Sequence, residues 1–148
     1  HGMVKGYDTR ILGLNLRLPE INAAIAKIQM KKLPKFLKTR ERNAKLLSEL
    51  LSTSKLNLPI QRKNEKVNWY LYTVTTPKRN LLLKKLDEKG IGAASYYPIP
   101  VHKTPFYKTK IKLSVTDWAA SQVLSLPIHP KVTTKNIEFI SKSIFEIL

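Results

Sequence analysis

The chain has 148 residues, a length that suits one domain with a buried core, and its composition is that of a globular protein. The absence of cysteine excludes a disulfide framework, a thiolate nucleophile and a cysteine-ligated metal site. A count of 27 Lys and Arg against 10 Asp and Glu gives a formal net charge of +17, which favours polyanions as partners and says nothing about fold.

The N-terminal third predicts an extended segment followed by a long helix. Residues 1–18 are mixed in character and contain three of the five glycines. Pro19 and Glu20 suit the first turn of a helix, where a proline costs little and an acid complements the dipole. Apolar residues at helical spacing then continue to about Ser52, and the ring of Pro34 should kink or split this helix.

One face of this helix is strongly basic. Eight Lys and Arg residues lie between Lys27 and Lys45, opposed only by Glu41. They fit either a nucleic-acid-binding helix or a solvated outer face. We favour the solvated face, because no aromatic side chains are interleaved for base stacking.

The middle of the chain predicts strands around a second helix. The run Val67–Thr76 is rich in β-branched and aromatic residues and predicts a strand, after a shorter one near Asn57–Gln61. Lys78–Lys89 predicts an amphipathic helix capped by a glycine, and Ile91–Tyr97 another strand. Alternation in the first strand places Val67, Trp69 and Leu71 on one face and Tyr70, Tyr72 and Val74 on the other, both covered.

The C-terminal third predicts a fixed loop and two more helices. Pro98–His102 cannot be a regular helix or a central strand, because each proline lacks an N–H. Thr116–Leu124 predicts a short helix, and Thr133–Leu148 a closing helix with isoleucines along one side. Helices and strands without a regular βαβ repeat indicate an α+β fold.

Few residues carry recognisable chemistry. Signatures of serine hydrolases, phosphate-binding loops, zinc proteases and paired carboxylates are absent, so we predict no catalytic residue and no metal site in this chain. His102 follows two tyrosines and two prolines, which fits a rigid loop that offers imidazole and phenol groups to a ligand. The alternative is a histidine that only packs or caps the loop. His129, between Pro127 and Pro130, is expected to be structural.

Three blocks of the sequence carry a family resemblance. They are Gly13-Leu14-Asn15-Leu16-Arg17 with Pro19-Glu20 and Ala23-Ala24, Tyr96-Tyr97-Pro98-Ile99-Pro100-Val101-His102 with Pro105 and Tyr107, and Val123-Leu124-Ser125-Leu126-Pro127-Ile128-His129-Pro130. In order and spacing they resemble the DegT/StrS sugar aminotransferases. Gly90-Ile91 and His1-Gly2 are similar to two further positions of that family.

The resemblance implies the C-terminal portion of a fold-type-I, pyridoxal-phosphate-dependent aminotransferase. Such enzymes move an amino group, usually from glutamate, onto a keto-sugar carried by a nucleotide. The implied fold is a small α+β domain, with a small, mostly antiparallel sheet packed with helices, entered by the long helix kinked near Pro34. Residues 1–18 would be a segment left over from the large domain, and residues 19–148 the small domain with its connecting helix.

The resemblance also implies roles for individual residues. Asn15 would reach the cofactor phosphate of the neighbouring subunit, with Arg17 adding positive charge there. His102 and Tyr97 would line the substrate side. The Schiff-base lysine of the family lies upstream of the position matched by His1, so we expect this chain alone to bind no pyridoxal phosphate and to be inactive.

Two hypotheses about partners follow. As part of an aminotransferase, the chain would form a homo-oligomer, most simply a dimer, would serve nucleotide-sugar and amino-acid substrates, and would bind nucleic acid only non-specifically. The alternative is a stand-alone basic α+β module that binds nucleic acid or another polyanion. No apolar run is long enough to span a bilayer and no secretory signal is present, so we expect a cytoplasmic protein without membrane contact.

Overall fold

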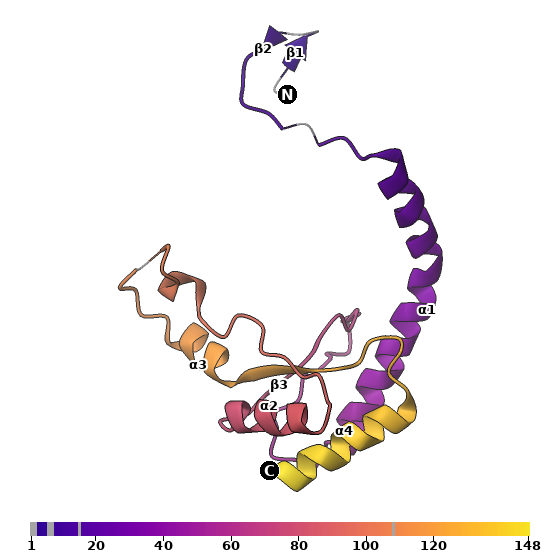
Figure 1. The fold of residues 1–148 in the computed structure, drawn as a ribbon, viewed down its shortest axis with the longest axis vertical. Coiled ribbons are helices and arrows are strands. Elements are labelled where there is room, and N and C mark those ends of the chain that lie inside the picture. The colour runs from indigo at the N-terminus through magenta and orange to yellow at the C-terminus, as the bar shows by residue number, and fades with distance from the viewer. Residues whose placement is uncertain (1–2, 6–7, 15, 108) are drawn as a thin grey trace. The chain divides into compact units, whose positions relative to one another are not determined.

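The computed structural model describes residues 3–5, 8–14, 16–107 and 109–148. Its contacts divide the chain into two units, His1–Pro34 and Lys35–Leu148. Figure 1 shows the elements in chain order. The candidate site lies wholly in the second unit.

The first unit contains a small hairpin and the start of a helix. Strand β1 (Met3–Lys5) pairs antiparallel with β2 (Asp8–Thr9), so the segment predicted to be extended includes a short strand pair. Helix α1 begins at Glu20, and the N–H of Ala23 donates to the carbonyl of Pro19 at 3.0 Å.

Helix α1 (Glu20–Leu50) continues through Pro34 without a break. The predicted split is therefore wrong, and the end predicted near Ser52 falls two residues earlier. Proline removes one N–H donor from a helix, and the hydrogen bonds on either side suffice to carry this one through. The lysines of the basic face are exposed, as expected of a solvated face, whereas Arg40 is half-buried.

A short antiparallel strand pair forms the centre of the second unit. Strand β3 (Tyr72–Thr75) pairs with β4 (Val123–Leu126), with Tyr72 opposite Leu126. Isolated bridges from Asn57 to Thr75 and from Ala94 to Ser125 extend this pairing on both sides. The predicted small antiparallel sheet is confirmed.

Several predicted strand boundaries are wrong. The strand expected from Val67 begins only at Tyr72, because the backbone of Trp69 turns to a φ of +50° and leaves the extended region. The alternation of faces fails with it: Trp69 and Tyr72 are both buried, with ring centroids 5.9 Å apart and planes inclined by 29°. The strands expected at residues 57–61 and 91–97 are reduced to the two single bridges.

The three remaining helices lie close to their predicted positions. Helix α2 (Arg79–Glu88) ends in a Schellman motif: Gly90, at φ +73°, donates to the carbonyl of Asp87, and Ile91 donates to that of Leu86. Helix α3 (Ser114–Gln122) stops before the predicted Leu124, because the next residues form β4. Helix α4 (Thr134–Ile147) begins with a capping box between Thr133 and Asn136.

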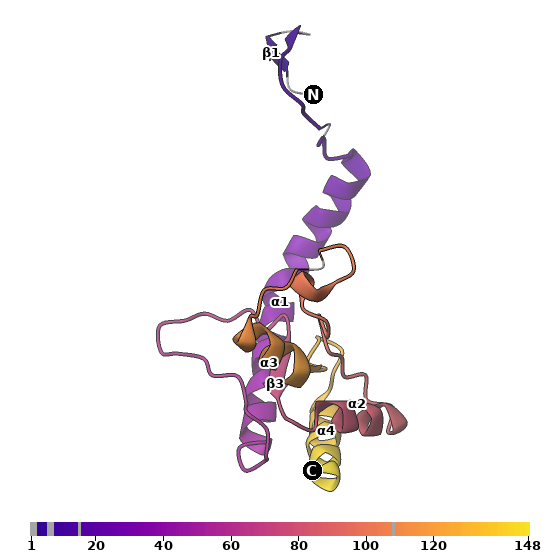
Figure 2. The ribbon, with the colours of Figure 1, turned by 90° about the vertical axis from the view of Figure 1, so that its left-hand side faces the viewer.

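The core lies between the second half of α1, the strand pair, α2 and α4. Figures 1 and 2 show α2 and α4 next to each other below the two strands, where they are in contact. The fully buried side chains of this core include Leu47, Tyr72, Val74, Leu82, Leu86, Leu124, Ile137 and Ile144. Burial of these apolar groups fixes the strand pair, and the strand pair in turn places the loops that carry the candidate site.

Candidate functional site

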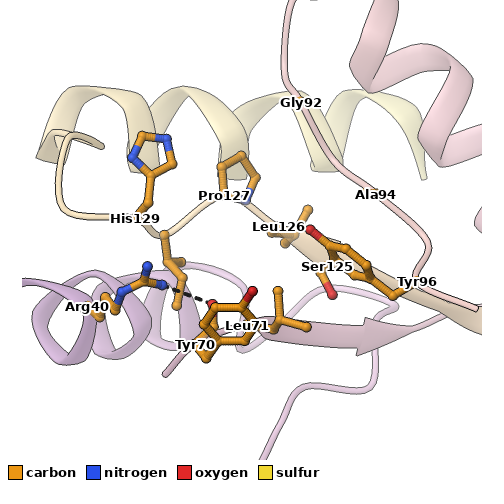
Figure 3. Close-up of a pocket in the computed structure, with 11 residues that line it drawn as sticks. Arg40, Tyr70, Leu71, Gly92, Ala94, Tyr96, Ser125, Leu126, Pro127 and His129 are labelled. Atoms are coloured by element: carbon orange, nitrogen blue, oxygen red, sulfur yellow. Dashed lines mark hydrogen bonds between the residues drawn. The ribbon is translucent and has the colours of Figure 1, made fainter. Parts of the chain in front are cut away.

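A pocket of about 260 Å³ opens beside the strand pair. Figure 3 shows that its walls come from separate parts of the chain: α1, the segment before β3, the bridge segment around Ala94, and β4 with the turn after it. The lining residues are Arg40, Tyr70, Leu71, Gly92, Ala94, Tyr96, Ser125, Leu126, Pro127, Ile128 and His129. The pocket thus combines a cation, two phenols and an imidazole with an apolar floor.

Arg40 ties α1 to the turn that precedes β3. Its Nη1 donates to the carbonyls of Trp69 at 3.1 Å and Tyr70 at 2.9 Å, and its guanidinium carbon lies 5.8 Å from the centre of the Tyr70 ring. The positive φ of Trp69 turns these carbonyls out of the strand pairing, so a side-chain donor satisfies them instead. Both bonds use Nη1, and both acceptors are neutral carbonyls. The positive charge of the guanidinium therefore stays uncompensated by these bonds at the pocket wall.

The two tyrosines at the start of the proline-rich loop differ in position. Tyr96 is 51% exposed and lines the pocket, whereas Tyr97 is 78% exposed and does not. Tyr97 has a φ of +56°, an uncommon conformation for a bulky residue that turns the chain sharply before Pro98. The sequence pattern pointed to the phenols of both residues, and the resemblance assigned Tyr97 to the substrate side. The structure places Tyr96 at this pocket, and the assignment of Tyr97 stays a prediction.

His102 lies in a loop that is closed on itself. It belongs to the short 3₁₀ turn Val101–Lys103, and its carbonyl accepts from both the N–H and the hydroxyl of Thr109, at 3.2 and 3.1 Å. Its side chain is only 11% exposed, and its Nε2 lies 3.7 Å from Oδ1 of Asp117 on α3. The imidazole thus faces a carboxylate within the chain, and its proposed contact with a ligand stays a prediction.

Arg79 contacts Ser95, the residue that precedes the proline-rich loop. Its side chain is buried, with 8% of the residue exposed, and its Nη1 donates to the hydroxyl of Ser95. It forms no ion pair with any residue that the structure describes. A buried guanidinium at the start of α2 gave no signal in the sequence, and its partner lies 16 residues away along the chain.

Asn43 supports the turn on the far side of the pocket. This fully buried amide donates to the carbonyls of Ile128 at 3.3 Å and Val132 at 3.0 Å, and its oxygen accepts from Arg42. His129 lies within that turn and accepts from the N–H of Lys131 at 3.3 Å through Nδ1. That bond agrees with the structural role expected of His129, although the ring also lines the pocket.

The predicted cofactor contacts lie in the first unit. Asn15 falls outside the described residues. Arg17 is exposed, and its side chain makes no hydrogen bond or ion pair with the described part of the chain. Both assignments therefore stay predictions.

The described residues do not by themselves form a site for pyridoxal phosphate or for a metal ion. Such a cofactor needs a shielded lysine, and every lysine side chain that the structure describes is exposed. Over the same described ranges, no group of three His, Asp or Glu side chains could hold a metal ion. None of the helices in those ranges is long and apolar enough to cross a membrane.

Known sequences match almost the whole chain. A model of the DegT/DnrJ/EryC1/StrS aminotransferase family matches residues 1–145. A dTDP-3-amino-3,4,6-trideoxy-alpha-D-glucose transaminase of Streptomyces venezuelae is 34% identical over 135 residues, which cover 88% of this chain and 36% of the relative. A UDP-2-acetamido-2-deoxy-3-oxo-D-glucuronate aminotransferase of Pseudomonas aeruginosa is 32% identical over 141 residues, covering 95% and 39%.

Solved structures also match almost the whole of this chain with less than half of their own length. DesV of S. venezuelae, crystallised with a ketimine intermediate, superposes with a TM-score of 0.89 at 29% identity, covering 98% of this chain and 40% of DesV. An aminotransferase from Brucella abortus gives a TM-score of 0.88 at 27% identity, with the same coverage. NtdA of Bacillus subtilis, solved with the cofactor PMP, gives 0.75 at 25% identity, covering 97% of this chain and 36% of NtdA. The chain spans about two fifths of the length of these relatives.

Proposed function

Because the chain belongs to the DegT/DnrJ/EryC1/StrS aminotransferase family, we propose that it is the C-terminal portion of an enzyme that aminates a nucleotide-linked keto-sugar. Its α+β fold is that of the matching part of a fold-type-I aminotransferase. The observation that carries the proposal is the family match over residues 1–145, with relatives described as transaminases of dTDP- and UDP-linked sugars. We propose glutamate as the amino donor.

The proposed division of the chain follows the resemblance. Residues 1–18 would belong to the large domain, and residues 19–148 to the small domain with the long connecting helix. The core formed by the second half of α1, the strand pair and the helices after it supports a separate small domain.

The substrate side of the site is assigned to the loop and pocket of the second unit. The guanidinium of Arg40 and the exposed phenols of Tyr70 and Tyr96 suit a sugar nucleotide, which offers anionic phosphates and hydroxyl groups. We propose that Tyr97, whose ring is mostly exposed, and His102 also contact this substrate.

Pyridoxal phosphate is assigned to the complete protein and not to this chain alone. When bound, it supplies the aldehyde that carries the amino group between donor and acceptor. We propose that Asn15 and Arg17 contact its phosphate in a neighbouring subunit. The exposed guanidinium of Arg17, with no acidic partner among the described residues, supports this assignment.

A homo-oligomer, most simply a dimer, would complete such a site. On the first half of α1, Ile21, Ile25 and Ile28 are exposed at helical spacing, and monomers rarely expose contiguous apolar patches of this kind. Sedimentation of the chain at several concentrations tests this. A monomer at every concentration would refute the proposed self-association.

The test of the function uses the protein with its upstream part restored, either by the native sequence or by fusion to a close relative. Incubated with glutamate and nucleotide-linked keto-sugars, it should give the amino-sugar nucleotide and 2-oxoglutarate, both measured by mass spectrometry. This chain alone is the control and should give neither product nor a dialysis-resistant absorption band with pyridoxal phosphate. If the restored protein aminates none of a panel of dTDP- and UDP-linked substrates on which a relative is active, the proposal fails.

A further inference from the structure

Two buried polar atoms face each other between the proline-rich loop and α3. Nε2 of His102 and Oδ1 of Asp117 are both shielded from solvent, and neither has a hydrogen-bond partner among the described residues. They lie 3.7 Å apart, a few tenths of an ångström beyond hydrogen-bond range. Since an unpaired buried polar atom is costly, Nε2 of His102 needs an acceptor, and Oδ1 of Asp117 is the one that faces it.

The chemistry of the pair fixes the direction of the bond. A carboxylate can only accept, so the hydrogen must lie on Nε2 of the imidazole. The ammonium of Lys103 lies 2.7 Å from the same Oδ1 and forms an ion pair with it, although it is not aligned as a hydrogen bond. Asp117 lies in the first turn of α3 and is therefore carried by a rigid element.

The backbone on the other side of the pair is also fixed. Pro98 and Pro100 restrict the loop before His102, and Thr109 closes it behind by donating twice to the His102 carbonyl. The loop thus fixes the backbone of His102, but these backbone contacts do not select which ring nitrogen carries the hydrogen. Only a contact to the ring itself can set its orientation and tautomer.

We propose that Asp117 is a positioning residue for His102, which it holds in the tautomer with hydrogen on Nε2. Nδ1 is then the only acceptor of the neutral ring. This proposal extends the proposed function and rests on it for one point, which is that His102 contacts the nucleotide sugar. A ring whose remaining nitrogen accepts will bind a donor, so His102 recognises a sugar hydroxyl rather than a phosphate, whose oxygens only accept.

The first experiment needs no activity and uses this chain. It contains three histidines, so the imidazole nitrogens can be assigned one by one in ¹H–¹⁵N spectra recorded above pH 8. For His102 we expect a resolved proton on Nε2, protected from exchange with water, and a lone-pair signal from Nδ1. The Asp117→Ala variant should lose the protected proton, whereas Asp117→Asn should retain it, because the amide oxygen still accepts.

The control is Lys103→Ala, which removes the ammonium and leaves the carboxylate, and should keep the proton on Nε2. Amide spectra of each variant show whether α3 is folded, and Asp117→Asn keeps the test decisive if Asp117→Ala unfolds. A proton on Nδ1 of His102 in the unsubstituted chain would overturn the proposal. So would a protected Nε2 proton that survives in a folded Asp117→Ala variant.

The second experiment uses the complete enzyme and separates the two proposals. Asp117→Ala should raise KM for the nucleotide sugar about tenfold with kcat changed less than twofold, and Asp117→Asn should restore most of the loss. If the spectra show the Nε2 proton but the complete protein aminates no sugar, the proposed function fails and the positioning role stands. If amination occurs and the Nε2 proton is absent, the positioning role alone fails.

Discussion

Replacing Gly90 with alanine should destabilise the fold through the backbone alone. Gly90 has a φ of +73°, and a Cβ added there would meet nothing within 4 Å. No steric contact contributes, so the penalty is the cost of placing an L-residue in the left-handed region, about 1–2 kcal/mol. Alanine also lowers the conformational entropy of the unfolded chain, which raises the free energy of unfolding by about 0.4–1 kcal/mol. The net loss is roughly 1 kcal/mol, or about 2–4 °C in Tm for a chain of this size.

Gly92 provides a matched control two residues away. A Cβ there would also meet nothing within 4 Å, but its backbone is not in the left-handed region. Gly92→Ala should therefore be neutral or stabilise by up to about 1 kcal/mol. The unfolded-state effect is the same in both variants, so their difference isolates the strain at Gly90.

Urea unfolding of the two variants, followed by circular dichroism, measures this difference in the free energy of unfolding. We expect Gly90→Ala to be less stable than Gly92→Ala by about 1–2 kcal/mol, with equal slopes in urea. A difference below about 0.5 kcal/mol would refute the reasoning, because the Schellman turn would then tolerate a side chain. A large loss in both variants would refute it as well, since it would place neighbouring atoms where the structure has open space.

Three further predictions concern the core and the proposed site. Asn43→Ala should lower the free energy of unfolding by about 2–4 kcal/mol, because two buried backbone carbonyls lose their donor, and a loss below about 1 kcal/mol in urea unfolding would contradict this. Burial raises the pKa of Tyr72 above 10.0, although the hydrogen bond between Tyr72 and Ser48 opposes the shift, so the unfolded chain releases this proton first. Stability should consequently fall as the pH rises beyond about 10, and Tyr72→Phe should remove that part of the fall; an unchanged pH profile in the variant would count against it. In the protein with its upstream part restored, Asn15→Ala should weaken cofactor retention roughly tenfold. His102→Ala should instead raise KM for the sugar nucleotide and leave the absorption spectrum of the cofactor intact. If His102 only packs the loop, the variant will lose thermal stability and its kinetics will not change.

Local signals in the sequence predicted the parts of the fold that local chemistry decides. Gly90 was expected to cap the second helix because only glycine adopts the left-handed conformation at little cost, and it does so. The closing helix begins beside Thr133, as expected; Ile137, Ile140 and Ile144 on its inner side are buried, and Ile147 is partly buried. The small antiparallel sheet and the α+β class followed from the order of elements and the family resemblance, and both are confirmed.

The pocket could not be predicted, because long-range pairing brings its walls together. Tyr70 and Tyr96 line one pocket only when β3 pairs with β4 and Ala94 bridges to Ser125 on β4. No local sequence pattern predicts the left-handed backbone at Trp69. Bulky residues adopt this conformation rarely, and only where tertiary contacts stabilise it.

Arg40 departs from the solvated lysines around it, because it is half-buried and contacts the turn that precedes β3. The sequence placed it among the lysines of a solvated surface, and its charge alone gave no reason to separate it from them. Its Nη1 donates to the carbonyls of Trp69 and Tyr70 while the planar guanidinium lies near the Tyr70 ring, whereas a lysine carries a compact ammonium on a flexible stem. The residue that satisfies the carbonyls of the Trp69 turn therefore also brings positive charge to the pocket, so Arg40→Lys should affect the turn and the pocket together.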